Sequence, residues 1–145
     1  MASSSICVDA SFVVRTLTGP GDQELRALWQ LWADEARLVA APSLIFYEVA
    51  NALYRLRRFG HLSADAADLA LDAALALPLH LQSSPDLHRQ AVALAQRFAL
   101  GACYDAHYLA LAQNLETDFW TCDGRLARAV GGHLPWVRFV DTDPP

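Results

Sequence analysis

Four acidic residues follow a predicted strand or lie near the start of a predicted helix: Asp9, Glu48, Asp105 and Asp123. Asp9 comes directly after the apolar run 5–8, and Asp123 after the strand-like segment 119–122. The other two acids lie in the first or second turn of predicted helices. In a parallel sheet, the carboxyl ends of the strands and the starts of the following helices share one edge. The sequence therefore predicts that the four carboxylates converge there.

Converging carboxylates indicate a particular chemistry. Like charges at close range raise one another's pKa unless a cation holds them together. Oxygen ligands suit Mg²⁺ or Mn²⁺ rather than Zn²⁺. Such an ion can activate water and stabilise charge on a phosphoryl group. We expect phosphodiester hydrolysis, with the four acids as catalytic and metal-binding residues.

Taken singly, each acid has a simpler explanation. Asp9 could cap the helix that follows it, and Glu48 could belong to a solvated helix face. Asp105 is favoured by the helix dipole without any function, and Asp123 could be a turn residue. Only their joint placement on one edge indicates a site.

Other polar residues could support this site. Ser11 and Thr121 each lie two residues from an acid and could orient water or a carboxylate, although local capping explains them equally well. Asn51, one helical turn beyond Glu48, could support it or be exposed. Arg55 and Arg58 belong to the densest basic cluster and could contact a phosphate backbone, or stabilise the end of a helix.

Short buried strands alternate with amphipathic helices along the chain. Strands are predicted at 5–8, 38–41, 78–82, 119–122 and 136–140. This alternation predicts an α/β fold, with a parallel sheet of about five strands and helices on both faces. The length suits one domain over 1–145 that ends in a polar tail, 141–145.

Local signals place several helices more finely. A helix is predicted over 22–36. Ser43 is a candidate N-cap for the helix that reaches about residue 58. After Ser63, the predicted buried face of the next helix comprises Ala66, Leu69, Ala70, Ala73 and Leu77.

Composition excludes several classes of function. The formal net charge is −5, so the molecule as a whole is not a basic nucleic-acid binder. All eleven basic residues are arginine, which excludes Schiff-base and P-loop chemistry, because both need lysine. The three isolated cysteines, the lack of a secretory signal and the lack of a long apolar run predict a cytoplasmic protein without a membrane partner.

Four segments in order resemble the PIN-domain family, and most closely its VapC-type toxins: VDAS, PSLIFYEVANAL, YDAHYLALA and TCDGRLARA. The resemblance covers nearly the whole chain. It implies a parallel α/β/α sandwich and an endoribonuclease that depends on Mg²⁺ or Mn²⁺. Asp9, Glu48, Asp105 and Asp123 match the family's acidic residues, while Thr121 and Ser11 match its small polar ones.

The same resemblance implies partners: an RNA substrate, a VapB-type antitoxin that inhibits the enzyme, and a homodimer or toxin–antitoxin hetero-oligomer. Two alternatives stay open, a PIN-fold binding module without activity and a PIN nuclease of RNA processing outside such a pair. Phosphate-accepting receivers and haloacid-dehalogenase-like phosphatases also place an Asp after the first strand. Both families need a lysine near the phosphate, however, and this chain has none.

Overall fold

A sheet of five parallel strands runs through the computed structural model, which describes residues 4–19 and 23–141. The strand order is β3-β2-β1-β4-β5. The strands are β1 (Ser5–Val8), β2 (Leu38–Pro42), β3 (Leu79–Gln82), β4 (Phe119–Thr121) and β5 (Val137–Phe139). The predicted α/β class and parallel sheet are confirmed.

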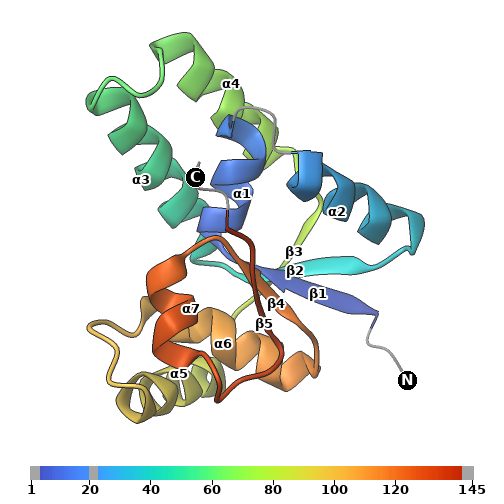
Figure 1. The fold of residues 1–145 in the computed structure, drawn as a ribbon, viewed down its shortest axis with the longest axis vertical. Coiled ribbons are helices and arrows are strands. Elements are labelled where there is room, and N and C mark those ends of the chain that lie inside the picture. The colour runs from blue at the N-terminus through green and yellow to red at the C-terminus, as the bar shows by residue number, and fades with distance from the viewer. Residues whose placement is uncertain (1–3, 20–22, 142–145) are drawn as a thin grey trace.

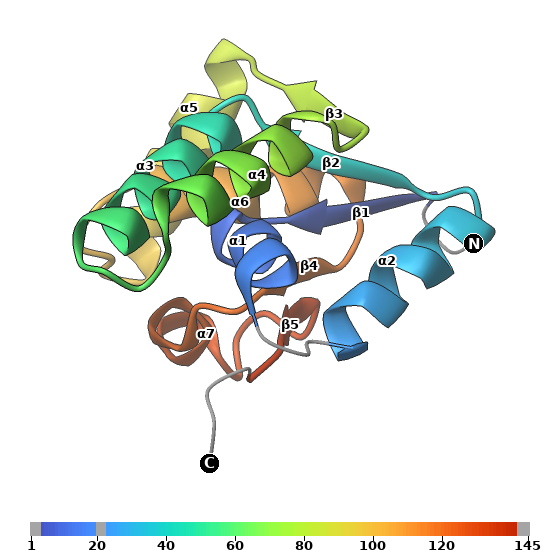
Figure 2. The ribbon, with the colours of Figure 1, turned by 90° about the horizontal axis from the view of Figure 1, so that it is seen from above.

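Helices cover both faces of this sheet. In the described residues they are α1 (Ala10–Thr18), α2 (Gln23–Asp34), α3 (Ile45–Arg58), α4 (Ala64–Leu75), α5 (Pro85–Arg97), α6 (Tyr104–Leu115) and α7 (Gly124–Val130). Figure 1 shows α1 to α4 on one side of the sheet and α5 to α7 on the other. Seen from above in Figure 2, α1, α3 and α4 lie in front and α6 lies behind. This is the predicted α/β/α sandwich.

The central strands are apolar along their length because both faces are covered. Ile6, Cys7 and Val8 of β1 are buried. In contrast, His80 and Leu81 of β3 are exposed, as befits a strand at the edge of the sheet. The weakly apolar sequence of β3 therefore reflects its position.

An aromatic cluster fixes α1 between the sheet and α2. Phe12 is fully buried, and its ring centroid lies 6.0, 5.6 and 6.5 Å from those of Trp29, Trp32 and Trp120. The indole nitrogen of Trp29 donates a hydrogen bond of 2.9 Å to the Thr16 hydroxyl. Because these contacts hold α1 along its length, its N-terminus is held against the end of β1.

The strand order places a switch point between β1 and β4. The chain builds the sheet outward from β1 to β2 and β3, and then returns to place β4 on the other side of β1. In open α/β sheets, the crevice at the carboxyl ends of two such strands is the usual ligand site. Asp9 follows β1 there, and Asp123 lies two residues after the end of β4.

The prediction that Ser43 caps α3 is wrong. The helix begins at Ile45, and its N-cap, Leu44, makes no capping hydrogen bond through its side chain. The Ser43 amide instead donates to the Gln82 carbonyl at 3.2 Å and so prolongs the pairing of β2 with β3. The later start places Glu48 in the first turn of α3.

Of the predicted buried face of α4, only Ala70 is confirmed as buried. The helix buries Ala67, Ala70 and Ala74, whereas Leu69 is 70% exposed. Asp65, Asp68 and Asp72 mark a polar stripe, but alanine and leucine fill the other positions of α4, so the hydrophobic period does not select which apolar residues are buried. Packing against α1 and α3 determines the face instead.

Some expectations fall outside the described residues, namely residue 22 at the predicted start of α2 and residues 142–145 of the predicted tail. Asp141, the described part of that tail, is exposed. In the described parts of the chain, no helix combines the length and the apolar character needed to cross a membrane.

The aromatic cluster should dominate local stability. Phe12→Ala should lower the free energy of unfolding by about 3–5 kcal/mol, because it removes a fully buried ring and leaves a cavity. Urea unfolding measures this change. Leu69→Ala, at an exposed position, should stay within about 0.5 kcal/mol of the wild type. Equal effects of the two substitutions would contradict this packing.

Candidate active site

Each of the four acids stands at the start of a helix. Asp9 is the N-cap of α1, and Asp123 is the N-cap of α7. Glu48 and Asp105 lie in the first turns of α3 and α6. The positive end of a helix dipole stabilises a carboxylate by about 0.3–1 kcal/mol. Four helix starts therefore offset part of the repulsion between these acids.

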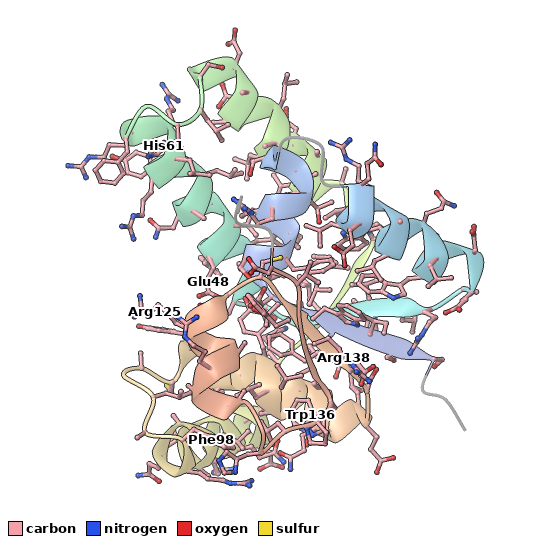
Figure 3. All side chains as sticks on the ribbon, viewed as in Figure 1. Glu48, His61, Phe98, Arg125, Trp136 and Arg138 are labelled. Carbon is pink, nitrogen blue, oxygen red and sulfur yellow. The ribbon has the colours of Figure 1, made fainter. Side chains whose placement is uncertain are left out.

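The structure brings the four acids together on one cleft of about 710 Å³. The cleft extends from the ends of β1 and β4 along the helices α1 and α3, which pack against each other. Figure 3 marks Glu48 in α3 and Arg125 in α7. The lining of the cleft also includes Ala10, Ser11, Val14, Arg15, Thr18, Ala52, Arg55, Leu56, Phe59, His61, Tyr108 and Cys122.

Asp9 is the most enclosed of the four acids. One carboxylate oxygen accepts hydrogen bonds from the Ser11 hydroxyl at 2.6 Å and the Phe12 amide at 2.9 Å. The other accepts from the Thr121 hydroxyl at 2.5 Å. The residue is 4% exposed, so its orientation is determined by these three donors.

The same hydroxyl groups join the end of β4 to the end of β1. The Thr121 hydroxyl oxygen accepts a hydrogen bond of 3.0 Å from the Asp123 amide. The Ser11 hydroxyl oxygen accepts one of 2.9 Å from the Cys122 amide. Ser11 and Thr121 therefore fix the backbone that carries Asp123 as well as the side chain of Asp9.

Burial raises the pKa of Asp9 to about 6, and the charge of Asp105 adds to this rise. The hydrogen bonds from Ser11, Thr121 and Phe12 act in the opposite direction, because they favour the charged form. The fold thus holds Asp9 in a place that is costly for a charge.

Glu48 is held by Tyr108, which lies on the apolar face of α6 and was not among the predicted site residues. Tyr108 is fully buried, and its hydroxyl donates a hydrogen bond of 2.5 Å to a Glu48 oxygen. Burial raises the pKa of Glu48, while this hydrogen bond lowers it. Burial, together with the charge of Glu48, also raises the pKa of Tyr108, so the phenol stays a donor. A signal was present: the tyrosine lies one turn after Asp105 on that face.

Asp105 links the pKa values of the acids through electrostatic repulsion. Burial raises its pKa first and the charge of Asp123 raises it further, while Arg125 lowers it. In turn, the charge of Asp105 raises the pKa of both Asp9 and Glu48. The cleft is therefore a site where added positive charge would be stabilising.

Only some of the other predicted site residues line the cleft. Ser11 and Arg55 line the cleft, and Thr121 lies buried beneath it. Asn51 and Arg58 are exposed and do not line the cleft. The cleft also includes Arg15, Phe59 and His61, which were not singled out as site residues.

The four carboxyl groups of the cleft are candidate ligands for a divalent cation. Three of the four carboxyl groups have a raised pKa, and oxygen donors of this kind suit Mg²⁺ or Mn²⁺. Over residues 4–19 and 23–141, no three His, Cys, Asp or Glu side chains already form a group that could hold a metal ion. The type of donor in the cleft therefore suits a hard divalent ion, although the side chains are not gathered around one point.

The fold and the acidic cleft together define a class of α/β protein with carboxylates at the switch point of a parallel sheet. The model of the PIN domain family matches residues 6–132. The chain belongs to the PIN domain family, as its four motifs predicted. No curated protein matches it in sequence.

Solved structures share this fold. PAE2754 from Pyrobaculum aerophilum is 24% identical with a TM-score of 0.64, over 90% of this chain and 87% of that one. A toxin–antitoxin complex from Klebsiella pneumoniae matches with 19% identity and a TM-score of 0.61, over 91% and 94%. The Mycobacterium tuberculosis toxin VapC20, described as cleaving the sarcin–ricin loop, matches with 24% identity and a TM-score of 0.60, over 96% and 99%.

The raised pKa of Asp9 predicts how stability depends on pH without divalent ions. Because the folded state binds this proton more tightly, the free energy of unfolding should fall as pH rises from about 4 to about 6. For Asp9→Asn, the free energy of unfolding should fall less over this pH range. Above pH 6 this variant should therefore be more stable than the wild type, by up to about 3 kcal/mol.

Urea unfolding in a chelating buffer, compared between the two proteins at each pH, measures this difference. The comparison removes most of the contributions of Glu48 and Asp105, because both proteins retain these acids, and leaves only their coupling to Asp9. A variant that is less stable than wild type at pH 7 would contradict the assignment of a burial penalty to Asp9.

Proposed function

We propose that this protein is the toxin of a type II, VapBC-like toxin–antitoxin pair and an Mg²⁺- or Mn²⁺-dependent endoribonuclease. One observation carries the proposal: four carboxylates from distant parts of the chain line one cleft at the switch point of the sheet. Membership of the PIN domain family supports it.

In this proposal Asp9, Glu48, Asp105 and Asp123 hold the divalent ion. When bound, the ion supplies a polarised water and stabilises negative charge on the phosphoryl group. Without it, the acids would repel a phosphodiester, and three of them have a raised pKa.

The chain's remaining site residues would position these acids. Thr121 and Ser11 hold both oxygens of Asp9, and Tyr108 holds Glu48. These hydrogen bonds restrict the movement of the Asp9 and Glu48 carboxylates, so these two acids would need less reorganisation when an ion binds. Arg55 lies on the same cleft and provides positive charge for an RNA backbone.

The proposal of RNA as the substrate and of an antitoxin as the partner rests on the fold shared with solved toxins, one of them in a toxin–antitoxin complex. Exposed apolar side chains on α3 and α4 support a protein partner, whether a VapB-type antitoxin or a second copy in a homodimer. They are Tyr47, Tyr54, Leu69 and Leu75. The three cysteines are free thiols, in keeping with a reducing cytoplasm.

A binding module without activity is the weaker alternative. Burying Asp9 beside other carboxylates destabilises the fold, and a module without activity gains nothing in return. Neutral residues at these positions would make such a module more stable. A PIN nuclease of RNA processing would share the chemistry, and the absence of an antitoxin gene beside this one would favour it.

Cleavage of a mixed pool of structured RNA tests the enzyme directly. The wild type should cut only with Mg²⁺ or Mn²⁺, and Asp9→Asn should lower the rate at least about 100-fold by removing one ligand charge. Asp118→Asn is the matched control. Asp118 lies at the opposite end of β4 and pairs with Arg138 at 3.3 Å, so this variant should cut normally. Unchanged cutting by Asp9→Asn would refute the assignment of the site.

A further inference from the structure

The cleft has two chemically different ends. The four acids occupy the end formed by the strands. Arg55, Phe59 and His61 line the other end, at and just beyond the C-terminus of α3. Figure 3 shows Glu48 and His61 near opposite ends of this helix. Glu48 and Phe59 are eleven residues apart, or roughly 16 Å along a helix, so the far end cannot contact the same phosphate as the acids.

Phe59 presents an open aromatic ring in this far end. Its side chain is 60% exposed although it lines the cleft, so it is not a core residue. The Arg58 guanidinium lies 5.8 Å from the centre of the ring. One cation thus lies beside the exposed ring, and a second, Arg55, lines the same end of the cleft.

We propose that the far end of the cleft is a nucleotide subsite for single-stranded RNA. A base that flanks the cleaved position stacks on Phe59, and Arg55 contacts a backbone phosphate. Proteins bind single strands by this combination of aromatic stacking and positive charge. The inference rests on the proposed nuclease function and adds to it the strand form and the path of the substrate.

Charge favours RNA over a protein segment as the occupant. A peptide that covers the acidic end would itself need to be cationic, and it would meet Arg55 in the far end and Arg58 beside the ring of Phe59. A nucleic-acid strand has phosphates for these arginines and bases for the ring. At the acidic end it relies on the divalent ion.

Binding of a fluorescently labelled single-stranded RNA of mixed sequence tests the subsite. All proteins carry Asp9→Asn, so the strand is not cut, and anisotropy gives the dissociation constant. Phe59→Ala should weaken binding about 5- to 100-fold. Tyr54→Ala is the matched control, because Tyr54 is also 60% exposed on α3 but does not line the cleft; it should bind as its parent does.

Two further variants separate stacking from loss of structure. Phe59→Trp should bind at least as tightly as the parent, whereas Phe59→Leu should bind as weakly as Phe59→Ala, because leucine lacks an aromatic face. Arg55→Ala should reduce the slope of log affinity against log salt by about 1. Arg57→Ala, an exposed neighbour outside the cleft lining, should leave the slope unchanged.

The outcomes distinguish the subsite from the nuclease. If the Asp9→Asn parent binds RNA and Phe59→Ala or Phe59→Leu binds as tightly, the subsite is overturned and the nuclease is unaffected. If these variants bind RNA normally but lose a cationic antitoxin peptide, the far end docks protein and the subsite is again overturned. If the parent binds no RNA and the wild type cuts none with metal, both proposals fail together.

Discussion

The buried carboxylate of Asp9 at the switch point is the constraint on which the site depends. A charge that is 4% exposed needs fixed donors. They come from two places: the first turn of α1, through the Ser11 hydroxyl and the Phe12 amide, and the end of β4, through the Thr121 hydroxyl. The Thr121 hydroxyl bonds to Asp9 and to the Asp123 amide, so one side chain sets the spacing of two acids. The parallel pairing of β1 with β4 makes that contact possible.

The same carboxylates work against stability. Burial raises the pKa of Asp9, Glu48 and Asp105, which means that their charged forms destabilise the fold. Helix starts and hydroxyl donors offset only part of this penalty. The aromatic cluster around Phe12 and the buried strands stabilise the frame elsewhere. Clustered charge that the fold must compensate is typical of functional sites.

The sequence predicted the elements better than their details, and the reasons are physical. Strands buried on both faces form continuous apolar runs, so the class of fold and the position of Asp9 after β1 were readable. Backbone pairing displaced the expected cap at Ser43, and an alanine-rich helix carries no clear period. The role of Tyr108 was hidden because an aromatic residue on an apolar stripe is expected in the core; it is buried there, yet its hydroxyl reaches Glu48.

The net charge of −5 raises the question of how such a molecule could attract RNA. Net charge acts over long distances and is screened in the cell, whereas the cleft acts at contact distance. In the proposed nuclease the acids would hold a divalent ion at one end of the cleft, and Arg55 and Phe59 lie at the other end. A strand bound in this way would gain affinity from a bound ion, one or two arginines and stacking. Recognition that depends on few charges leaves shape and base contacts to determine which RNA is bound, so a negative protein can be a selective nuclease.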